Sequence, residues 1–257
     1  MNLLTRIFGR TTPPQEGGFD APLAPERPFF VIGDIHGALP LLERLLQVIE
    51  QMEECPTVVC VGDYIDRGEY SAQVLELLMS LTARFPDLFY CLKGNHEQFL
   101  LEFLEKPEQA AERWLRHGGL QTLASYGIGA AREGARDRLR DVLVQSMGED
   151  TIAWLHGLPS FWKSGNVAVV HAGADPARPI EEQPERALIW GHSDFTRHPR
   201  RDGIWVAHGH IVVKEPQKTM GRINVDTGAY ATGILSAAYI TKGKVTFLNQ
   251  AGQVADP

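Results

Sequence analysis

Three short blocks of polar residues follow apolar runs at nearly equal intervals, and their residue types are those that bind metal ions. The blocks are residues 33–37 (GDIHG), 62–68 (GDYIDRG) and 94–97 (GNHE). Carboxylate, imidazole and amide groups offer the mixed oxygen and nitrogen ligands that divalent transition metals accept. Two carboxylates in one block, Asp63 and Asp66, are costly at a buried strand end unless a cation compensates their charge.

Each block has a simpler explanation when it is taken alone. Asp34 could cap a helix with His36 as a surface neighbour, and Asn95 could cap the next helix. The charges of residues 62–68 could form a solvated, ion-paired loop, although Arg67 also offers a planar fork suited to phosphate oxygens. Five ligand-bearing strand ends in one chain, counted with the two histidines below, favour a functional site over these separate explanations.

Two histidines further along the chain stand in similar places. His171 ends the apolar run 167–170, and His210 comes shortly after the run that ends at Ala207. A lone histidine in an apolar run is more often a core residue. A centre that already holds Asp, His, Asp and Asn nevertheless needs further nitrogen ligands to fill two coordination spheres. His208 competes with His210 for the last ligand position.

The sequence between the blocks predicts alternating strands and helices. Short apolar runs predict buried strands, and apolar residues at helical spacing predict amphipathic helices. The expected strands are residues 29–33, 57–62 and 88–92, and the expected helices are 39–54, 71–84 and 97–105. Asp34, Asp63 and Asn95 are therefore separated by 29 and 32 residues, the repeat length of βαβ units. That register places them at the carboxyl ends of neighbouring parallel strands, where open α/β sheets bind ligands.

The second half of the chain predicts an insertion and a further sheet. Residues 107–158 are expected to be mainly helical and to cover one side of the cleft. Strands are then expected at residues 167–170, 203–207, 222–225, 234–240 and 244–248. Successive strands with few helices between them predict a second, partly antiparallel sheet. The expected fold is therefore a two-sheet α/β/β/α sandwich with a helical insertion.

Length and composition are those of one folded domain. The chain has 257 residues with 44% hydrophobic and 22% charged side chains, enough to bury a sizeable core. Residues 1–28 are rich in proline and glycine and are predicted to be a disordered tail, so the expected domain spans 29–250. The net charge of −7 argues against broad nucleic-acid binding, since such proteins usually carry a basic surface.

Two further expectations concern the membrane and the compartment. No apolar stretch approaches the length needed to cross a membrane, so no membrane-spanning helix is expected. The three cysteines, Cys55, Cys60 and Cys91, show no framework spacing, which favours a reducing compartment and a cytoplasmic location.

The order and spacing of GDIHG, GDYIDRG and GNHE resemble the phosphoprotein phosphatase family. The resemblance is to its bacterial and phage-like serine/threonine phosphatases, within the calcineurin-like metallophosphoesterase superfamily, and it extends over about residues 29–240. Shorter matches follow at residues 171–173 (HAG), 209–211 (GHI) and 224–228 (NVDTG).

The resemblance implies roles for individual residues. Asp34 and His36 would bind one metal, Asp63 would bridge both, and the second metal would be held by Asn95, His171 and His210. The catalytic residues would be His96, which protonates the leaving oxygen, and Asp66, which orients His96; Arg67 would clamp the phosphate with Asn95 beside it. Two cations sharing a bridging hydroxide could attack phosphorus directly, so no phosphoenzyme is needed. Manganese is the expected metal, and the ligand set also suits iron or zinc.

The resemblance implies hydrolysis of phosphate monoesters, first of all on phosphoserine or phosphothreonine proteins. A hydrolase of dinucleoside polyphosphates or other small phosphoesters would use the same ligands, and a non-catalytic phosphate-binding protein is a further alternative. One departure bears on substrate choice. His192 stands where the family often has a second phosphate-binding arginine. The role of that arginine could be taken by His192 itself or by one of four arginines, or the second phosphate contact could be absent. These arginines are Arg186, Arg197, Arg200 and Arg201. The oligomeric state has no signature in the sequence.

Overall fold

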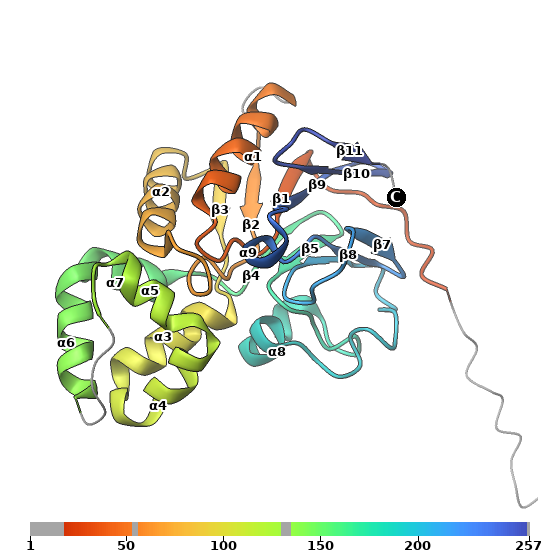
Figure 1. Ribbon diagram of the computed structural model, residues 1–257. Coiled ribbons are helices and arrows are strands. Elements are labelled where there is room, and N and C mark those ends of the chain that lie inside the picture. Colours follow the sequence, from red (N-terminus) through yellow and green to blue (C-terminus); the bar gives the residue numbers. More distant parts are fainter. Residues whose placement is uncertain (1–17, 53–55, 130–134, 256–257) are drawn as a thin grey trace, which may run out of the picture.

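Two mixed β-sheets pack face to face, with helices on their outer faces (Figure 1). The computed structural model describes residues 18–52, 56–129 and 135–255. The first sheet has the strand order β11-β10-β9-β1-β2-β3 and the second β4-β5-β6-β8-β7. In chain order the strands are β1 (Phe29–Ile32), β2 (Val58–Cys60), β3 (Phe89–Cys91), β4 (Phe161–Ser164), β5 (Val167–Val170), β6 (Trp205–His208), β7 (Gln217–Thr219), β8 (Arg222–Asn224), β9 (Ser236–Thr241), β10 (Lys244–Asn249) and β11 (Val254–Ala255). The expected sandwich is confirmed.

Alternating side chains of β1 show how the layers are held together. Phe29 and Val31 face the second sheet and join a core shared with Val169 of β5. Phe30 and Ile32 point the other way, into the core beneath the outer helices. All four β1 residues are fully buried, because a strand covered on both faces has no solvent side.

The helices fall into two groups. The first sheet is covered by α1 (Leu39–Met52) and α2 (Ser71–Arg84), which connect the parallel strands β1, β2 and β3. The helical region contains α3 (Asn95–Glu105), α4 (Pro107–Trp114), the π-turn η2 (Leu115–Gly119), α5 (Leu120–Ser125), α6 (Arg136–Met147) and α7 (Glu149–Gly157). The short η3 (Ile180–Glu182) and α8 (Glu185–Trp190) lie in the long connection between β5 and β6, and α9 (Ala229–Thr232) follows β8.

Strand pairing differs from the sequence-based expectation at the C-terminal end. The runs now seen as β9 and β10 were expected in the second sheet. Instead, β9 pairs antiparallel with β1, with Val31 opposite Ala238, and β10 extends the first sheet beyond it. Hydrophobic pattern predicts that a segment is a strand, but it does not specify which sheet edge the strand joins. Strands β4, β7 and β11 were not predicted.

The segment before β1 is also more ordered than its composition suggests. Leu23 is buried, Phe19 packs edge-on against Trp205 at 4.9 Å, and the backbone N–H of Ala24 donates to Asn166 Oδ1 at 2.7 Å. Residues 18–28 therefore cover the second sheet, whereas the rest of the expected tail lies outside the described residues.

Two smaller expectations can be compared with the structure. Cys60 and Cys91 are buried free thiols, and Cys55 lies outside the described residues. Over the described part of the chain, no helix has both the length and the apolar character needed to cross a membrane.

Candidate metal centre and active site

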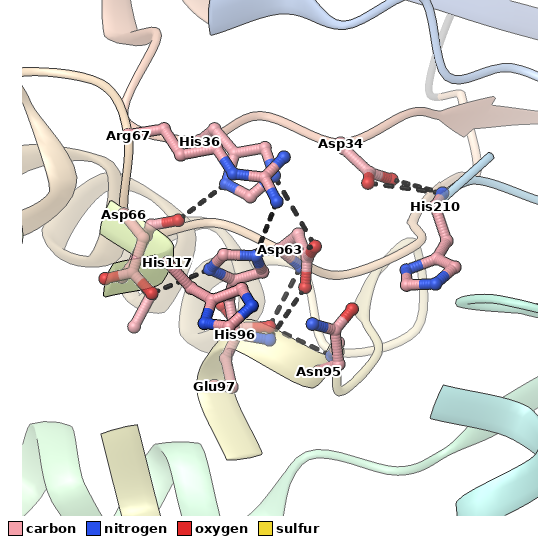
Figure 2. Close-up of polar contacts among 12 residues, drawn as sticks. Asp34, His36, Asp63, Asp66, Arg67, Asn95, His96, Glu97, His117 and His210 are labelled. Atoms are coloured by element: carbon pink, nitrogen blue, oxygen red, sulfur yellow. Dashed lines mark hydrogen bonds and ion pairs between the residues drawn. The ribbon is translucent and has the colours of Figure 1, made fainter. Parts of the chain in front are cut away.

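The predicted site residues come together where the strands of both sheets end (Figure 2). Asp34 follows β1, Asp63 follows β2, and Asn95 opens α3 after β3, while His171 and His210 follow β5 and β6 of the second sheet. Five residues of these loops have backbones in the left-handed region, which non-glycine residues rarely adopt: His36 (φ 45°), Asp63 (53°), Asp66 (70°), Arg67 (67°) and His210 (64°). Such strain persists only where surrounding structure enforces it, and it concentrates at functional sites.

Asp63 belongs to two clusters of potential metal ligands. Its Oδ1 lies 3.4 Å from His171 Nε2, and its Oδ2 lies 3.5 Å from His36 Nε2. His171 Nε2 is also 2.9 Å from Asn95 Oδ1 and 3.2 Å from His210 Nδ1. A cation about 2.1 Å from each ligand holds neighbouring ligand atoms about 3.0–3.4 Å apart, so these separations fit metal coordination.

The tautomer and the charge of the His36 imidazole suit a metal ligand. Its Nδ1 lies 2.8 Å from the carbonyl oxygen of Ile65, which can only accept, so Nδ1 carries the proton. Nε2 therefore presents a lone pair, and this buried atom has no hydrogen-bond partner in the structure. Burial lowers the pKa of His36 to about 3, which keeps the ring neutral. A carbonyl on one nitrogen and a free lone pair on the other is the usual arrangement of a metal-binding histidine.

Asp34 lies at the edge of the centre, next to the backbone of His210. The backbone N–H of His210 donates to its two oxygens at 3.1 and 3.2 Å. A Cβ on Gly209 would lie 2.0 Å from Asp34 Oδ1, so only glycine permits this approach. Burial raises the pKa of Asp34 well above its usual range, and the nearby carboxylates of Asp226 and Asp63 raise it further. A cation beside Asp34 would offset this accumulation of buried negative charge.

The protonation of Asp63 is set by its neighbours. Burial acts to raise its pKa, but His171, His96 and His36 outweigh burial and hold the pKa below the usual range for an aspartate. Asp63 is therefore ionised at neutral pH and can serve as a ligand to both clusters.

Glu97, which no sequence argument assigned, fixes the loops around Asp63. It accepts backbone N–H bonds from Asp63 and Gly94 at 2.9 Å and from Tyr64 at 2.8 Å. A Cβ on Gly94 would lie 2.2 Å from Asp63 Oδ1. Burial, followed by Asp63, raises the pKa of Glu97 to about 7.

His96 and Asp66 form a buried pair in the middle of the site. His96 Nδ1 lies 2.7 Å from Asp66 Oδ2, while the other oxygen of Asp66 accepts from Trp114 Nε1 at 3.0 Å and from Thr122 Oγ1 at 2.6 Å. Asp66 is thus held by the helical region on one side and holds His96 on the other. Burial acts to lower the pKa of His96, but Asp63 and Asp66 reverse this and raise it. The geometry suits an imidazole that delivers a proton from Nε2.

We expect Asp66→Asn to shift the alkaline limb of the kcat–pH profile to lower pH by about one to two units. A general acid must be protonated, so the rate falls as pH rises through the pKa of His96, and losing the Asp66 carboxylate lowers that pKa. The measurement is kcat between pH 5 and 10 on a phosphoserine peptide, with bound metal quantified in parallel. An unchanged limb with full metal content would contradict this role.

Arg67 lies over the same part of the site. Its Nη2 is 3.0 Å from His96 Nε2, and the amide N–H of Arg67 donates to the carbonyl of Gly118 at 3.3 Å. The guanidinium packs 4.8 Å from the centroid of the Tyr230 ring, which also contacts His36 edge-on at 5.2 Å. Sequence reasoning missed Tyr230, because an aromatic residue in the short helix α9 has no local signal of function.

The contact with Tyr230 predicts a measurable effect on phosphate affinity. We expect Tyr230→Ala to raise KM, and the inhibition constant of inorganic phosphate, by about two- to fivefold, because the cation–π contact that positions Arg67 is lost. Tyr230→Phe keeps the ring and should match the unsubstituted protein. Equal effects of the two substitutions would show that the hydroxyl, not the ring, is what matters.

The alternatives left open by the sequence are separated in space. His208 points its Nδ1 at the carbonyl of Gly209 and packs edge-on against Phe195 at 4.9 Å, whereas His210 faces His171. Burial lowers the pKa of His208 to about 4.

Two candidates for the second phosphate-binding position contact other residues. His192 Nε2 is 4.0 Å from Asp175, and Arg200 is engaged with Asp202 and with the carbonyls of Asp175 and Arg178. In the described residues no hydrogen bond or ion pair joins His192 or the four candidate arginines to the metal ligands, His96 or Arg67.

Comparison with known proteins agrees with this geometry. The family model of the calcineurin-like phosphoesterases matches residues 27–214. The chain belongs to this family. It is a metallophosphoesterase, a hydrolase of a family that depends on a dinuclear metal centre, and it carries candidate histidine and aspartate ligands for one.

Similar proteins have been given two kinds of name. Serine/threonine-protein phosphatase 2 of Escherichia coli is 38% identical over 224 residues, covering 82% of this chain and 91% of the relative. A bis(5′-nucleosyl)-tetraphosphatase of Oceanobacillus iheyensis is 29% identical over 230 residues, covering 80% and 86%. Among solved structures, the cold-active protein-tyrosine phosphatase of a psychrophilic Shewanella shares the fold, with a TM-score of 0.63, 16% identity and coverage of 94% and 83%.

Proposed function

We propose that this metallophosphoesterase is a serine/threonine protein phosphatase that hydrolyses phosphate monoesters. The observation that carries the proposal is the position of His96. A single imidazole, held by the buried carboxylate of Asp66, has its Nε2 3.9 Å from Oδ2 of Asp63, the carboxylate shared by both ligand clusters, and 3.0 Å from Arg67 Nη2. The 38% identity to a bacterial serine/threonine-protein phosphatase over most of both chains supports the substrate class.

The proposed metal ligands are the six predicted from the sequence. Asp34 and His36 would hold one ion, Asn95, His171 and His210 the other, and Asp63 both. The unpartnered Nε2 of His36 and the convergence of three ligand atoms on His171 Nε2 support a fit. We propose manganese, and iron or zinc would also suit a mixed nitrogen and oxygen set. When bound, two such ions supply charge neutralisation at the phosphoryl oxygens and an activated water.

The protein groups would act around that centre. Arg67 would offer a guanidinium to the phosphoryl oxygens, and Asn95, whose Oδ1 lies 2.9 Å from His171 Nε2, would contact the phosphate from the metal side. His96 would give its Nε2 proton to the leaving serine or threonine oxygen, while Asp66 stabilises the protonated ring and keeps it oriented. In this structure Arg67 Nη2 is hydrogen-bonded to His96 Nε2. Movement of the Arg67 guanidinium to the phosphate would free His96 Nε2 for proton transfer.

A second candidate is hydrolysis of dinucleoside polyphosphates. It is supported by the tetraphosphatase relative, which is 29% identical and aligned over 86% of its length. The two activities would share all six ligands, so the difference must lie in groups that contact the rest of the substrate.

One experiment separates the two candidates. Turnover with manganese is measured on phosphoserine and phosphothreonine peptides beside diadenosine tetraphosphate, with His96→Ala as the inactive control. We expect higher kcat/KM on the phosphopeptides. Faster cleavage of the dinucleotide would exclude the protein-phosphatase proposal. Turnover without added or bound metal would exclude the proposed dinuclear metal centre.

A further inference from the structure

A groove near His96 is lined by none of the residues assigned above. Its volume is about 470 Å³, and its walls come from α3, α4 and α8, which lie at one end of the molecule (Figure 1). The polar and aromatic side chains that line it are Gln98, Glu102, Arg113, Glu185, Arg186 and Trp190.

Phe99 connects His96 with the wall of the groove. Phe99 packs edge-on against His96 at 5.6 Å and against Trp190, in the groove wall, at 4.9 Å. Gln98 and Glu102 follow His96 on the same helix, about 3 and 9 Å along its axis. A donor of the leaving-group proton must lie next to the leaving oxygen, so the remainder of the substrate extends from His96 into its surroundings.

The charges of the groove are mostly paired. Glu102 forms an ion pair with Arg113, and Glu185 pairs with Lys93 at 3.0 Å. Arg186 is exposed and has no ion pair among the described residues. The groove therefore presents one uncompensated guanidinium between paired carboxylates.

We propose that this groove binds the polypeptide that carries the phosphorylated residue, and that Arg186 binds a carboxylate two or three positions away from it. The inference rests on the proposed function and specifies its substrate class. An extended peptide covers about 3.3–3.6 Å per residue, so two or three residues span the roughly 9 Å along α3 from His96 to Glu102 in the groove wall. A nucleoside polyphosphate leaving group would bring several negative charges against Glu102 and Glu185, with a single free cation to balance them.

The test compares two phosphoserine peptides that differ only in charge. One has aspartate and the other lysine at the second and third positions on both sides of the phosphoserine, and p-nitrophenyl phosphate serves as a substrate too small to reach the groove. The variants are Arg186→Glu and, as a matched control with the same change in net charge, Arg44→Glu on α1, which covers the first sheet. All are assayed as full-length, manganese-loaded protein.

We expect a two- to fivefold preference in kcat/KM for the aspartate peptide, about the effect of one exposed ion pair, and its reversal in Arg186→Glu. Arg44→Glu should keep the preference, and turnover of p-nitrophenyl phosphate should change less than twofold throughout. The inference is overturned if phosphopeptides are good substrates and Arg186→Glu shows the same preference between the two peptides as Arg44→Glu. Poor turnover of both peptides beside diadenosine tetraphosphate would instead overturn the proposed function, and the peptide groove with it.

Discussion

Asp63→Asn is expected to reduce bound metal from two ions to one or none and to lower kcat/KM by about 10²- to 10³-fold or more. The reason is that one carboxylate serves both ligand clusters, with Oδ1 near His171 and Oδ2 near His36. An amide keeps the shape but gives up the negative charge that two cations share, and metal ions contribute several kcal/mol of transition-state stabilisation. Elemental analysis of the purified variant and steady-state kinetics at saturating manganese provide the measurements.

A matched control comes from another buried aspartate. Asp226 lies beside Asp34, and its Oδ1 accepts from the backbone of Gly228 at 2.8 Å. Exchanging Asp226 for asparagine makes the same carboxylate-to-amide change at a residue that belongs to neither ligand cluster of the described residues. We expect Asp226→Asn to bind two ions and to lose less than about tenfold in activity. If Asp63→Asn retained full stoichiometry and turnover, the shared-ligand interpretation would be wrong.

His96→Ala is expected to lower kcat on phosphoserine peptides by about 10²- to 10⁴-fold, the usual contribution of a general acid. A serine alkoxide leaves poorly without a proton, whereas p-nitrophenolate is a stable anion and needs little assistance. The loss on p-nitrophenyl phosphate should therefore be at least tenfold smaller than the loss on the peptide. Steady-state kinetics on both substrates, with metal content measured for each preparation, give the comparison.

A neighbouring imidazole supplies the control for His96. His117 lies in η2 with its ring centroid 6.4 Å from that of His96, stacked on Phe99 at 4.7 Å, and it makes no contact with Asp66 in the described structure. We expect His117→Ala to lose less than about tenfold on either substrate. An equal loss on both substrates in His96→Ala would point to damage at the metal centre and not to a missing proton donor.

The helical region holds the carboxylate of Asp66 in a way that its sequence does not reveal. Trp114 and Thr122 are separated from Asp66 by about fifty residues, yet both donate to its Oδ1. At the level of sequence, Trp114 is one more apolar position in a helix. Its Nε1–H is seen as functional only once the helices fold back over the site, because a buried carboxylate must find its hydrogen-bond donors wherever the fold brings them.

The sequence by itself determined the three polar blocks and the strands that carry them. Asp34, Asp63 and Asn95 recur at βαβ spacing, and local hydrophobic pattern is enough to place them at neighbouring strand ends. Only the tertiary structure decided that His210, and not His208, faces His171, since His208 ends β6, His210 lies in the loop that follows, and backbone direction, not local pattern, aims the two side chains. The tertiary structure also placed β9 against β1 and Tyr230 against Arg67. These are contacts between distant segments, and their energy comes from packing that exists only after the two sheets have met.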